Sequence, residues 1–243
     1  MQIDLTGKTA VVTGAGRGIG RAIALSLAAA GARVLAVART EGDLVSLAAE
    51  AEGQIIPWVG DVLAAPFHDR IEALDRLDIL VNNAGGNKPM LMTDVDDATL
   101  DHLIALNIRS AYKTAQSAAR VMQRARQGVI VNMSSQMGHV GSARRTVYCM
   151  SKHAIEGLTK AMAVELAPDG IRVVAVAPTF VLTPMTAPYF DDPAFKAMVM
   201  DMIPLRQLAS PQDVADAVVF LASDKAGMIT GDSLKIDGGW TAR

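Results

Sequence analysis

The segment 13–20, TGAGRGIG, restricts the fold of this chain more than any other feature. It separates an apolar run at 9–12, which predicts a buried strand, from a helical segment at 21–30 that Gly31 would end. Glycines allow a sharp turn and a close approach of the backbone to a pyrophosphate. The start of a helix adds free N–H groups that attract anions. The segment therefore predicts a dinucleotide-binding strand–turn–helix unit, with a glycine-rich turn that binds nothing as the alternative.

The rest of the chain alternates short apolar runs with helical segments. Strands are expected at 33–38, 55–59, 79–81, 129–133, 171–177 and 233–237, and helices at 44–50, 67–74, 99–126, 147–167 and 211–223. Ser210 is placed to cap the last helix. This alternation predicts an α/β fold, a Rossmann-type doubly wound parallel sheet with helices on both faces. We expect a single domain over 1–243, in which 179–208 is inserted over the ligand-binding carboxyl edge of the sheet.

Composition excludes several classes of protein. Hydrophobic residues make up 51% of the 243 residues, which supports a large core rather than disorder. The net charge of -2, without a dense basic run, predicts no nucleic-acid partner. No secretory signal or membrane-spanning run is recognisable, so we expect a cytoplasmic protein without membrane association. The single cysteine, Cys149, excludes an internal disulfide, and the four scattered histidines predict no metal site.

The glycine turn has the spacing T-G-x-x-x-G-x-G, and here the chain resembles the short-chain dehydrogenase/reductase family. The resemblance continues in order through Asn82-Asn83-Ala84-Gly85, Asn107, Ser135, Tyr148-x-x-x-Lys152, Pro178 and Asp237-Gly238-Gly239. It implies an oxidoreductase that interconverts a carbonyl compound and an alcohol with a nicotinamide cofactor. The segments 36–40, 131–150 and Pro178-Thr179 look like the carbonyl reductase and L-xylulose reductase branch. That likeness implies a small sugar, polyol or dicarbonyl as substrate.

Four residues are candidates for catalysis. Tyr148 and Lys152 are four residues apart on a predicted helix and so share one face, and Ser135 lies thirteen residues before Tyr148, after a predicted strand. Tyr148 would exchange a proton with the substrate oxygen, and the ammonium of Lys152 would lower the tyrosine pKa from its ordinary value of about 10. The resemblance implies that Asn107 holds a helix distortion and a water that passes protons to Lys152. A satisfied polar residue inside a helix is the alternative for Asn107.

The end of the second predicted strand bears on the choice of nucleotide. An NAD-preferring site places an acidic residue there, whereas this chain has Ala38, Arg39 and Thr40. Arg39, together with Arg17 in the glycine turn, can bind a 2′-phosphate. This pattern predicts NADP(H), with NAD(H) as the alternative because Glu41 is near. The resemblance implies further cofactor contacts from Gly14, Gly16, Gly18, Ile19, Gly20, Asp61, Val62, Asn83, Ala84, Gly85, Pro178, Val181 and Thr183.

Substrate contacts are expected from Ser135, Gln136, Tyr148 and Thr179, with Gln136 on a substrate hydroxyl. The segment 184–203 is rich in methionine and phenylalanine, which suits either a flexible lid or core packing. The roles of Arg144 and Arg145 stay open between an acidic substrate, a solvated surface and a subunit contact.

Two other functions remain in view, a 3-oxoacyl thioester reductase and a non-catalytic NADP-binding redox sensor. A sensor would not need Ser135, Tyr148 and Lys152 together, so their presence favours the enzyme. The family resemblance also implies a homotetramer, with the helices at 99–126 and 147–167 as candidate contact surfaces.

Overall fold

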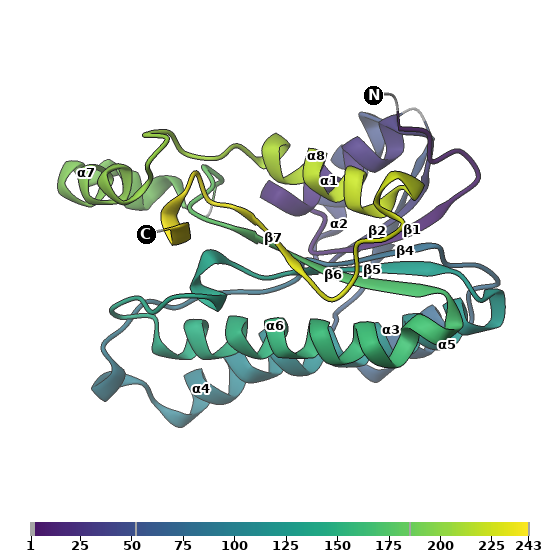
Figure 1. Cartoon of the computed structure of the whole chain (residues 1–243), viewed down its shortest axis with the longest axis horizontal. Coiled ribbons are helices and arrows are strands. Elements are labelled where there is room, and N and C mark those ends of the chain that lie inside the picture. The colour runs from purple at the N-terminus through teal and green to yellow at the C-terminus, as the bar shows by residue number, and fades with distance from the viewer. Residues whose placement is uncertain (1–2, 52, 185, 243) are drawn as a thin grey trace.

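A computed structural model describes residues 3–51, 53–184 and 186–242. Its described residues form a seven-stranded parallel sheet in the order β3-β2-β1-β4-β5-β6-β7 (Figure 1). The strands are β1 Thr9–Thr13, β2 Arg33–Ala38, β3 Ile55–Val59, β4 Ile79–Asn82, β5 Gly128–Met133, β6 Ile171–Pro178 and β7 Ser233–Ile236. Starting from the central pair β1 and β4, the chain adds β2 and β3 on one side and β5, β6 and β7 on the other, as the doubly wound prediction requires. The predicted α/β fold class is confirmed.

Helices cover both faces of the sheet. The helices α1 (Gly18–Ala29), α2 (Glu41–Ala49) and α8 (Pro211–Ala222) lie above it in Figure 1. Below it lie α3 (Ala65–Glu72), α4 (Asp97–Ile104), α5 (Ser110–Ala125) and α6 (Thr146–Leu166). Short 3-10 turns occupy Met92–Asp94, Gln136–Gly138, Ala167–Asp169, Ala187–Asp191, Asp224–Ala226 and Trp240–Ala242.

The two faces have separate apolar cores because neighbouring residues of a strand point to opposite sides. Val12 belongs to one buried cluster with Ile23 of α1 and Val218 of α8, whereas Val11 belongs to the other with Phe67 of α3 and Met122 of α5. Nearly every central strand residue is buried, as expected for parallel strands between two helical layers.

Helix α8 begins where the sequence predicted. The Ser210 side chain accepts a hydrogen bond from the Asp213 backbone N–H, and the Asp213 carboxylate accepts one from the Ser210 backbone N–H. This reciprocal capping box satisfies two backbone donors that the helix itself cannot bond. Among the described residues, no helix combines the length and the apolarity that crossing a membrane requires.

One helix was not predicted and another needs correction. The segment 179–208, expected as an insertion over the carboxyl edge of the sheet, contains the helix α7, Pro193–Met202. Asp192 caps this helix by accepting from the Ala194 N–H, and Pro193 occupies its first turn, a local signal that was overlooked. The expected helix at 99–126 is α4 and α5 joined by a π-helical turn, Ala105–Arg109.

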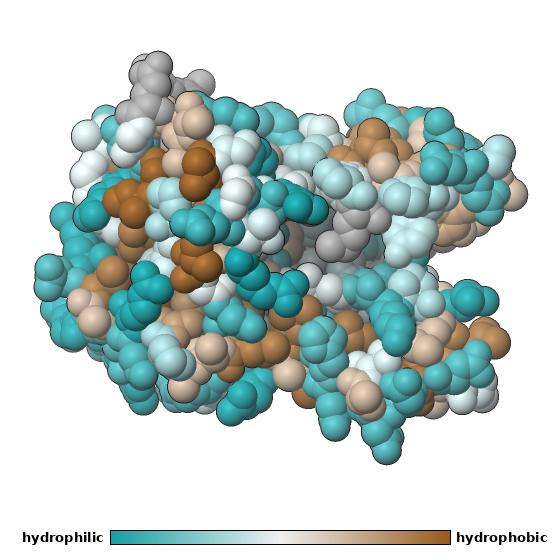
Figure 2. All heavy atoms as spheres, turned by 180° about the vertical axis from the view of Figure 1, so that it is seen from behind, coloured by the Kyte–Doolittle hydropathy of each residue, from teal (hydrophilic) through white to brown (hydrophobic). Residues whose placement is uncertain are grey.

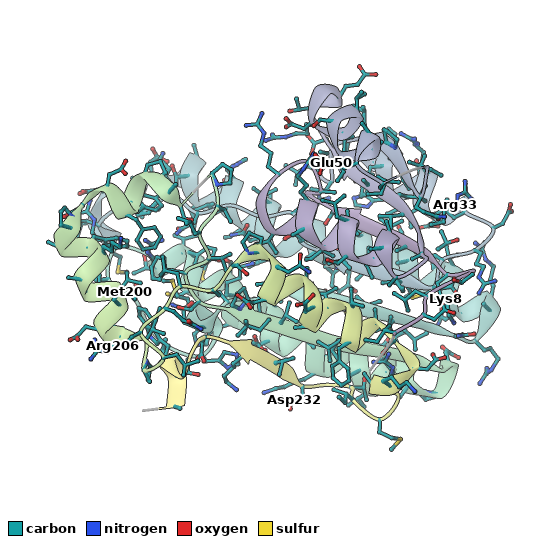
Figure 3. The ribbon with its side chains drawn as sticks, turned by 90° about the horizontal axis from the view of Figure 1, so that it is seen from above. Lys8, Arg33, Glu50, Met200, Arg206 and Asp232 are labelled. Carbon is teal, nitrogen blue, oxygen red and sulfur yellow. The ribbon has the colours of Figure 1, made fainter. Side chains whose placement is uncertain are left out.

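All seven strands point their carboxyl ends toward the end of the molecule that carries α7. In Figure 3, Met200 and Arg206 lie at that end, whereas Lys8 and Arg33 lie at the opposite one, where β1 and β2 begin. The turns after β1, β4, β5 and β6 therefore meet beside α7.

Candidate active site

A cavity of about 490 Å³ opens at the carboxyl edge of the sheet. Figure 2 shows the molecule hollowed on the side where α7 projects. Sixteen of the predicted site residues line this cavity: Gly14, Arg17, Gly18, Ile19, Gly20, Asn83, Ala84, Gly85, Ser135, Gln136, Tyr148, Lys152, Pro178, Thr179, Val181 and Thr183. The other six, which are Gly16, Arg39, Thr40, Asp61, Val62 and Asn107, lie outside the lining.

The glycine turn forms one end of the cavity through its backbone. A Cβ on Gly20 would lie 2.2 Å from the carbonyl oxygen of Gly14, so no side chain fits there. Gly14 and Gly18 have φ values of +66° and +55°, which favour glycine. Helix α1 starts at Gly18 with no side chain capping its first N–H groups. Open backbone donors beside a space free of side chains fit the pyrophosphate of a dinucleotide.

Asn83 ties the end of β4 to this turn. Its Nδ2 donates to the carbonyl oxygens of Thr13 (2.9 Å) and Gly14 (3.1 Å). The backbone N–H groups of Asn83 and Ala84 both donate to the Thr13 hydroxyl, each over 3.0 Å. The side chain expected to touch the adenosine therefore also holds the turn in shape.

The expected 2′-phosphate region contains a carboxylate that the sequence analysis missed. Arg17 forms two hydrogen bonds with Asp43 of α2, at 2.8 and 3.1 Å. A Cβ on Gly16 would lie 3.1 Å from the Asp43 Cβ and 3.2 Å from the Ala38 Cβ, so these residues surround one small space. Arg39 is exposed directly after β2. Asp43 could not be assigned from the sequence because its approach to the turn depends on how α2 packs.

The predicted adenine contacts follow β3 at the same edge of the sheet. Val62 is buried, whereas Asp61 is exposed and accepts a hydrogen bond from the Leu63 N–H. Thr40 is exposed and precedes the first residue of α2.

Ser135, Tyr148 and Lys152 all line the cavity. The Ser135 hydroxyl donates to the Gln136 Oε1 over 2.8 Å. The Lys152 Nζ donates to the Met133 carbonyl oxygen over 2.7 Å and lies 5.5 Å from the centre of the Tyr148 ring. These contacts join the end of β5 to the first turns of α6.

Burial dominates the ionisation of both α6 residues. It raises the pKa of Tyr148, which a hydrogen bond with Ser135 and the charge of Arg145 partly counteract. Burial lowers the pKa of Lys152 to about 8, against the opposing influence of Glu156. The Lys152 ammonium and the oxidised nicotinamide were expected to lower the Tyr148 pKa; within the protein, the cation that lowers it is Arg145.

Asn107 sits in the π-helical turn, so the expected helix distortion is present. Its side chain accepts from the Gly86 N–H and donates to the Gly86 carbonyl oxygen, both over 2.9 Å, and also donates to the Ser151 hydroxyl. A Cβ on Gly85 would lie 3.2 Å from the Asn107 Oδ1 and 3.9 Å from the Lys152 Nζ. Asn107 therefore lies behind Gly85, close to Lys152 but outside the cavity.

A buried amide network beneath the site was also missed. The Asn82 Nδ2 donates to the Asn132 Oδ1 over 3.0 Å, and the Asn132 Nδ2 donates to the Thr159 hydroxyl over 3.0 Å. The network joins β4 and β5, which Asn83 and Ser135 follow, to α6, which carries Tyr148. Its only sequence signal is an asparagine in each of two otherwise apolar strands.

Side chains rather than backbone form the far end of the cavity. Phe180 and Tyr189 line the cavity and belong to a cluster of five of the chain's ten aromatic residues, with Phe190, Phe195 and Trp240 packed behind them. Arg145 lines the cavity with its Cζ 5.4 Å from the Phe180 ring centre, whereas Arg144 is exposed. Within the described part of the chain, no cluster of three or more His, Cys, Asp and Glu side chains could hold a metal.

Comparisons with known proteins agree with this geometry. A family model described as enoyl-(acyl carrier protein) reductase matches residues 14–241. L-xylulose reductase from Bos taurus is 41% identical over the whole of both chains, and carbonyl reductase [NADPH] 2 from Sus scrofa is 39% identical over the same extent. A putative NAD(P)-dependent gluconate 5-dehydrogenase from Beutenbergia cavernae, solved with bound NADP, is 36% identical and superimposes over all of both chains with a TM-score of 0.95.

These full-length similarities, on a sheet whose carboxyl edge combines a glycine turn with a serine, a tyrosine and a lysine, show that the chain belongs to the short-chain dehydrogenase/reductase family of nicotinamide-dependent oxidoreductases.

Proposed function

We propose that this enzyme interconverts a ketone or aldehyde and an alcohol on a small sugar, polyol or dicarbonyl compound, with NADP(H) as cofactor. The observation that carries the proposal is the position of Ser135, Tyr148 and Lys152 in one cavity with the glycine turn. The relatives named as L-xylulose reductase and carbonyl reductase support the substrate class.

The residues divide the chemistry between them. When bound, the nicotinamide supplies or accepts the hydride at the substrate carbon. Tyr148 gives its phenolic proton to the substrate oxygen during reduction and takes it back during oxidation. Ser135 donates a hydrogen bond to the same oxygen and stabilises the charge that develops on it. Lys152 binds the ribose hydroxyls and, once released from the Met133 carbonyl, adds a positive charge near Tyr148.

Asn107 is a positioning residue that supports Ser135, Tyr148 and Lys152 from outside the cavity. Its contacts with Gly86 and Ser151 hold the π-helical turn next to Lys152. We assign to it the water that returns protons to Lys152 from solvent.

The preference for NADP(H) follows from charge. Arg39 and Arg17 bind the 2′-phosphate while Ala38 leaves room for it, and Thr40 adds a hydroxyl. Asp61 and Val62 contact the adenine, and Asn83 the adenosine. Val181 and Thr183 hold the carboxamide beside Pro178.

We further propose that 1–243 forms one domain and that four copies associate through α5 and α6. Tyr112 of α5 and Met150 and Val164 of α6 are large apolar side chains that are 46–79% exposed. Light scattering should give about four times the chain mass of 25.6 kDa, and a 25.6 kDa particle would refute the assembly.

An absorbance assay of NADPH and NADH oxidation tests the function. The substrates are ketoses, diketones, sugar acids and an acetoacetyl thioester. We expect faster oxidation of NADPH with a ketose, diketone or sugar acid. Preference for the thioester would instead support a 3-oxoacyl reductase. Tight NADPH binding with no turnover of any substrate would support a redox sensor.

A further inference from the structure

Four residues that line the cavity, Asn87, Ser134, Gln136 and Thr179, each have a buried polar side-chain atom without a partner among the described residues. The Gln136 Nε2 and the Thr179 Oγ1 have no hydrogen-bond partner among the described residues. Both side chains line the cavity, and the residues are only 2% and 9% exposed. A buried donor without a partner is costly, so these atoms are matched to polar groups of a bound molecule.

Arg145 is half-buried and lines the same cavity. Its guanidinium lies 5.4 and 5.8 Å from the ring centres of Phe180 and Tyr189, which hold it at the cavity wall. Burial, which removes part of the hydration of the guanidinium, lowers the pKa of Arg145. No aspartate or glutamate lines the described cavity, and none forms an ion pair with Arg145.

Another half-buried arginine shows how the fold normally satisfies such a group. Arg172 donates to the carbonyl oxygens of Ile229, Leu221 and Ser223, at 2.8 to 3.2 Å. Exposed arginines can also be paired: Arg120 of α5 forms an ion pair with Glu72 of the neighbouring helix α3. By contrast, the Arg145 side chain meets aromatic rings and the cavity, with no acceptor recorded among the described residues.

We propose that Arg145 binds a carboxylate of the substrate, so that the enzyme acts on hydroxy or keto acids with several hydroxyl groups. The planar guanidinium offers two parallel N–H donors to a carboxylate, and the aromatic rings fix its plane. Gln136 and Thr179 bind hydroxyls on the carbons between that carboxylate and the reacting carbon. This inference rests on the proposed function, which it narrows to acidic substrates.

The test compares two compounds that differ at one carbon. D-gluconate carries a carboxylate where D-glucitol carries a hydroxymethyl group, and each is offered with NADP⁺. We expect kcat/KM for gluconate to exceed that for glucitol at least tenfold. Arg145→Gln should lower this ratio by about 10- to 100-fold, mainly through KM, because a charge-assisted bidentate contact is lost. Arg145 also lowers the pKa of Tyr148, and this influence acts on the turnover of both substrates. The ratio of the two kcat/KM values therefore cancels it.

Two variants sharpen the comparison. Arg145→Lys keeps the positive charge but loses the two parallel N–H donors of the guanidinium. Its gluconate-to-glucitol ratio of kcat/KM should lie between those of the wild type and Arg145→Gln. Arg144→Gln removes an exposed charge from the adjacent position and should leave the ratio within about twofold of the wild type. Thermal melting checks that each variant is folded.

A calorimetric titration with tartrate, a dihydroxy dicarboxylate, separates the two proposals. If neither gluconate nor glucitol is oxidised and no carbonyl compound of the NADPH screen is reduced, the proposed function fails, yet loss of tartrate binding in Arg145→Gln would still support the carboxylate site. An unchanged gluconate-to-glucitol ratio, or equal tartrate binding by Arg145→Gln and wild type, would overturn the site and leave the broader function intact.

Discussion

The two ends of the active-site cavity are built by different means. The nucleotide end consists of main chain, with Gly14, Gly18 and Gly20 leaving space for phosphates and Asn83 holding their turn in place. The substrate end consists of side chains brought from distant parts of the chain, such as Arg145, Phe180 and Tyr189.

This difference reflects what each end has to recognise. A pyrophosphate is the same in every dinucleotide, so backbone donors with fixed geometry suffice. A substrate is recognised by its particular charges and hydroxyls, which only side chains can match. We therefore expect substitutions at the nucleotide end to act on backbone geometry or on nucleotide choice, and those at the substrate end to act on substrate choice.

Tyr148→Phe, where the two ends meet, should have the largest effect. Loss of the proton donor should lower kcat by about 10²- to 10⁴-fold while NADPH still binds, as measured by nucleotide fluorescence. Tyr112→Phe, an exposed tyrosine of α5, is the matched control. Full activity of Tyr148→Phe would remove this tyrosine from the mechanism.

Arg39→Asp tests the charge at the nucleotide end. We expect the ratio of kcat/KM for NADPH to that for NADH to fall by about 10- to 100-fold, because a carboxylate repels the 2′-phosphate. Arg33→Asp places the same change at the first residue of β2, the strand that Arg39 follows, and should not alter the ratio. Unchanged selectivity in Arg39→Asp would contradict the assignment.

Gly20→Ala probes the backbone itself. The new Cβ would lie 2.2 Å from the Gly14 carbonyl oxygen, so the free energy of unfolding should fall by about 1–3 kcal/mol through overpacking. Gly42→Ala in α2, where a Cβ meets nothing within 4 Å, should raise it by about 0.5 kcal/mol. Equal thermal stability of the two variants would show that the turn tolerates side chains.

Asp43→Asn should have a smaller effect of opposite sign to Arg39→Asp. Removing the carboxylate frees Arg17 for the 2′-phosphate and removes a repelling charge, so the Kd for NADPH should fall about two- to fivefold. The Kd for NADH, measured by the same fluorescence titration, serves as the control. Weaker NADPH binding would mean that Asp43 positions Arg17 productively.

Glu156→Gln gives the smallest predicted effect, a displaced pH profile. The Lys152 ammonium, with its pKa lowered to about 8, is lost as the pH rises through that value, so reduction should slow at higher pH. The charge of Glu156 raises the Lys152 pKa, and its removal should move the alkaline limb of kcat/KM toward lower pH. A move toward higher pH would contradict this electrostatic account.

Much of the nucleotide end was predictable because its signals are local. The turn glycines, the Ser210 cap and the spacing of Tyr148 and Lys152 depend on residues close together in the chain. The bounds of β2 and β3 agree with the strands expected from apolar runs. The helix α7 also had a local signal in Asp192 and Pro193, which methionine-rich composition obscured.

By itself, the sequence determined the α/β class, the doubly wound sheet and the set of residues at its carboxyl edge, because periodicity, caps and turns are encoded within a few neighbouring residues. Only the tertiary structure decided that Asp43 meets Arg17, that Asn82, Asn132 and Thr159 form one network, and that Arg145 rather than Arg144 enters the cavity. Those contacts depend on how helices pack across the sheet, and packing energy is shared among residues far apart in the chain.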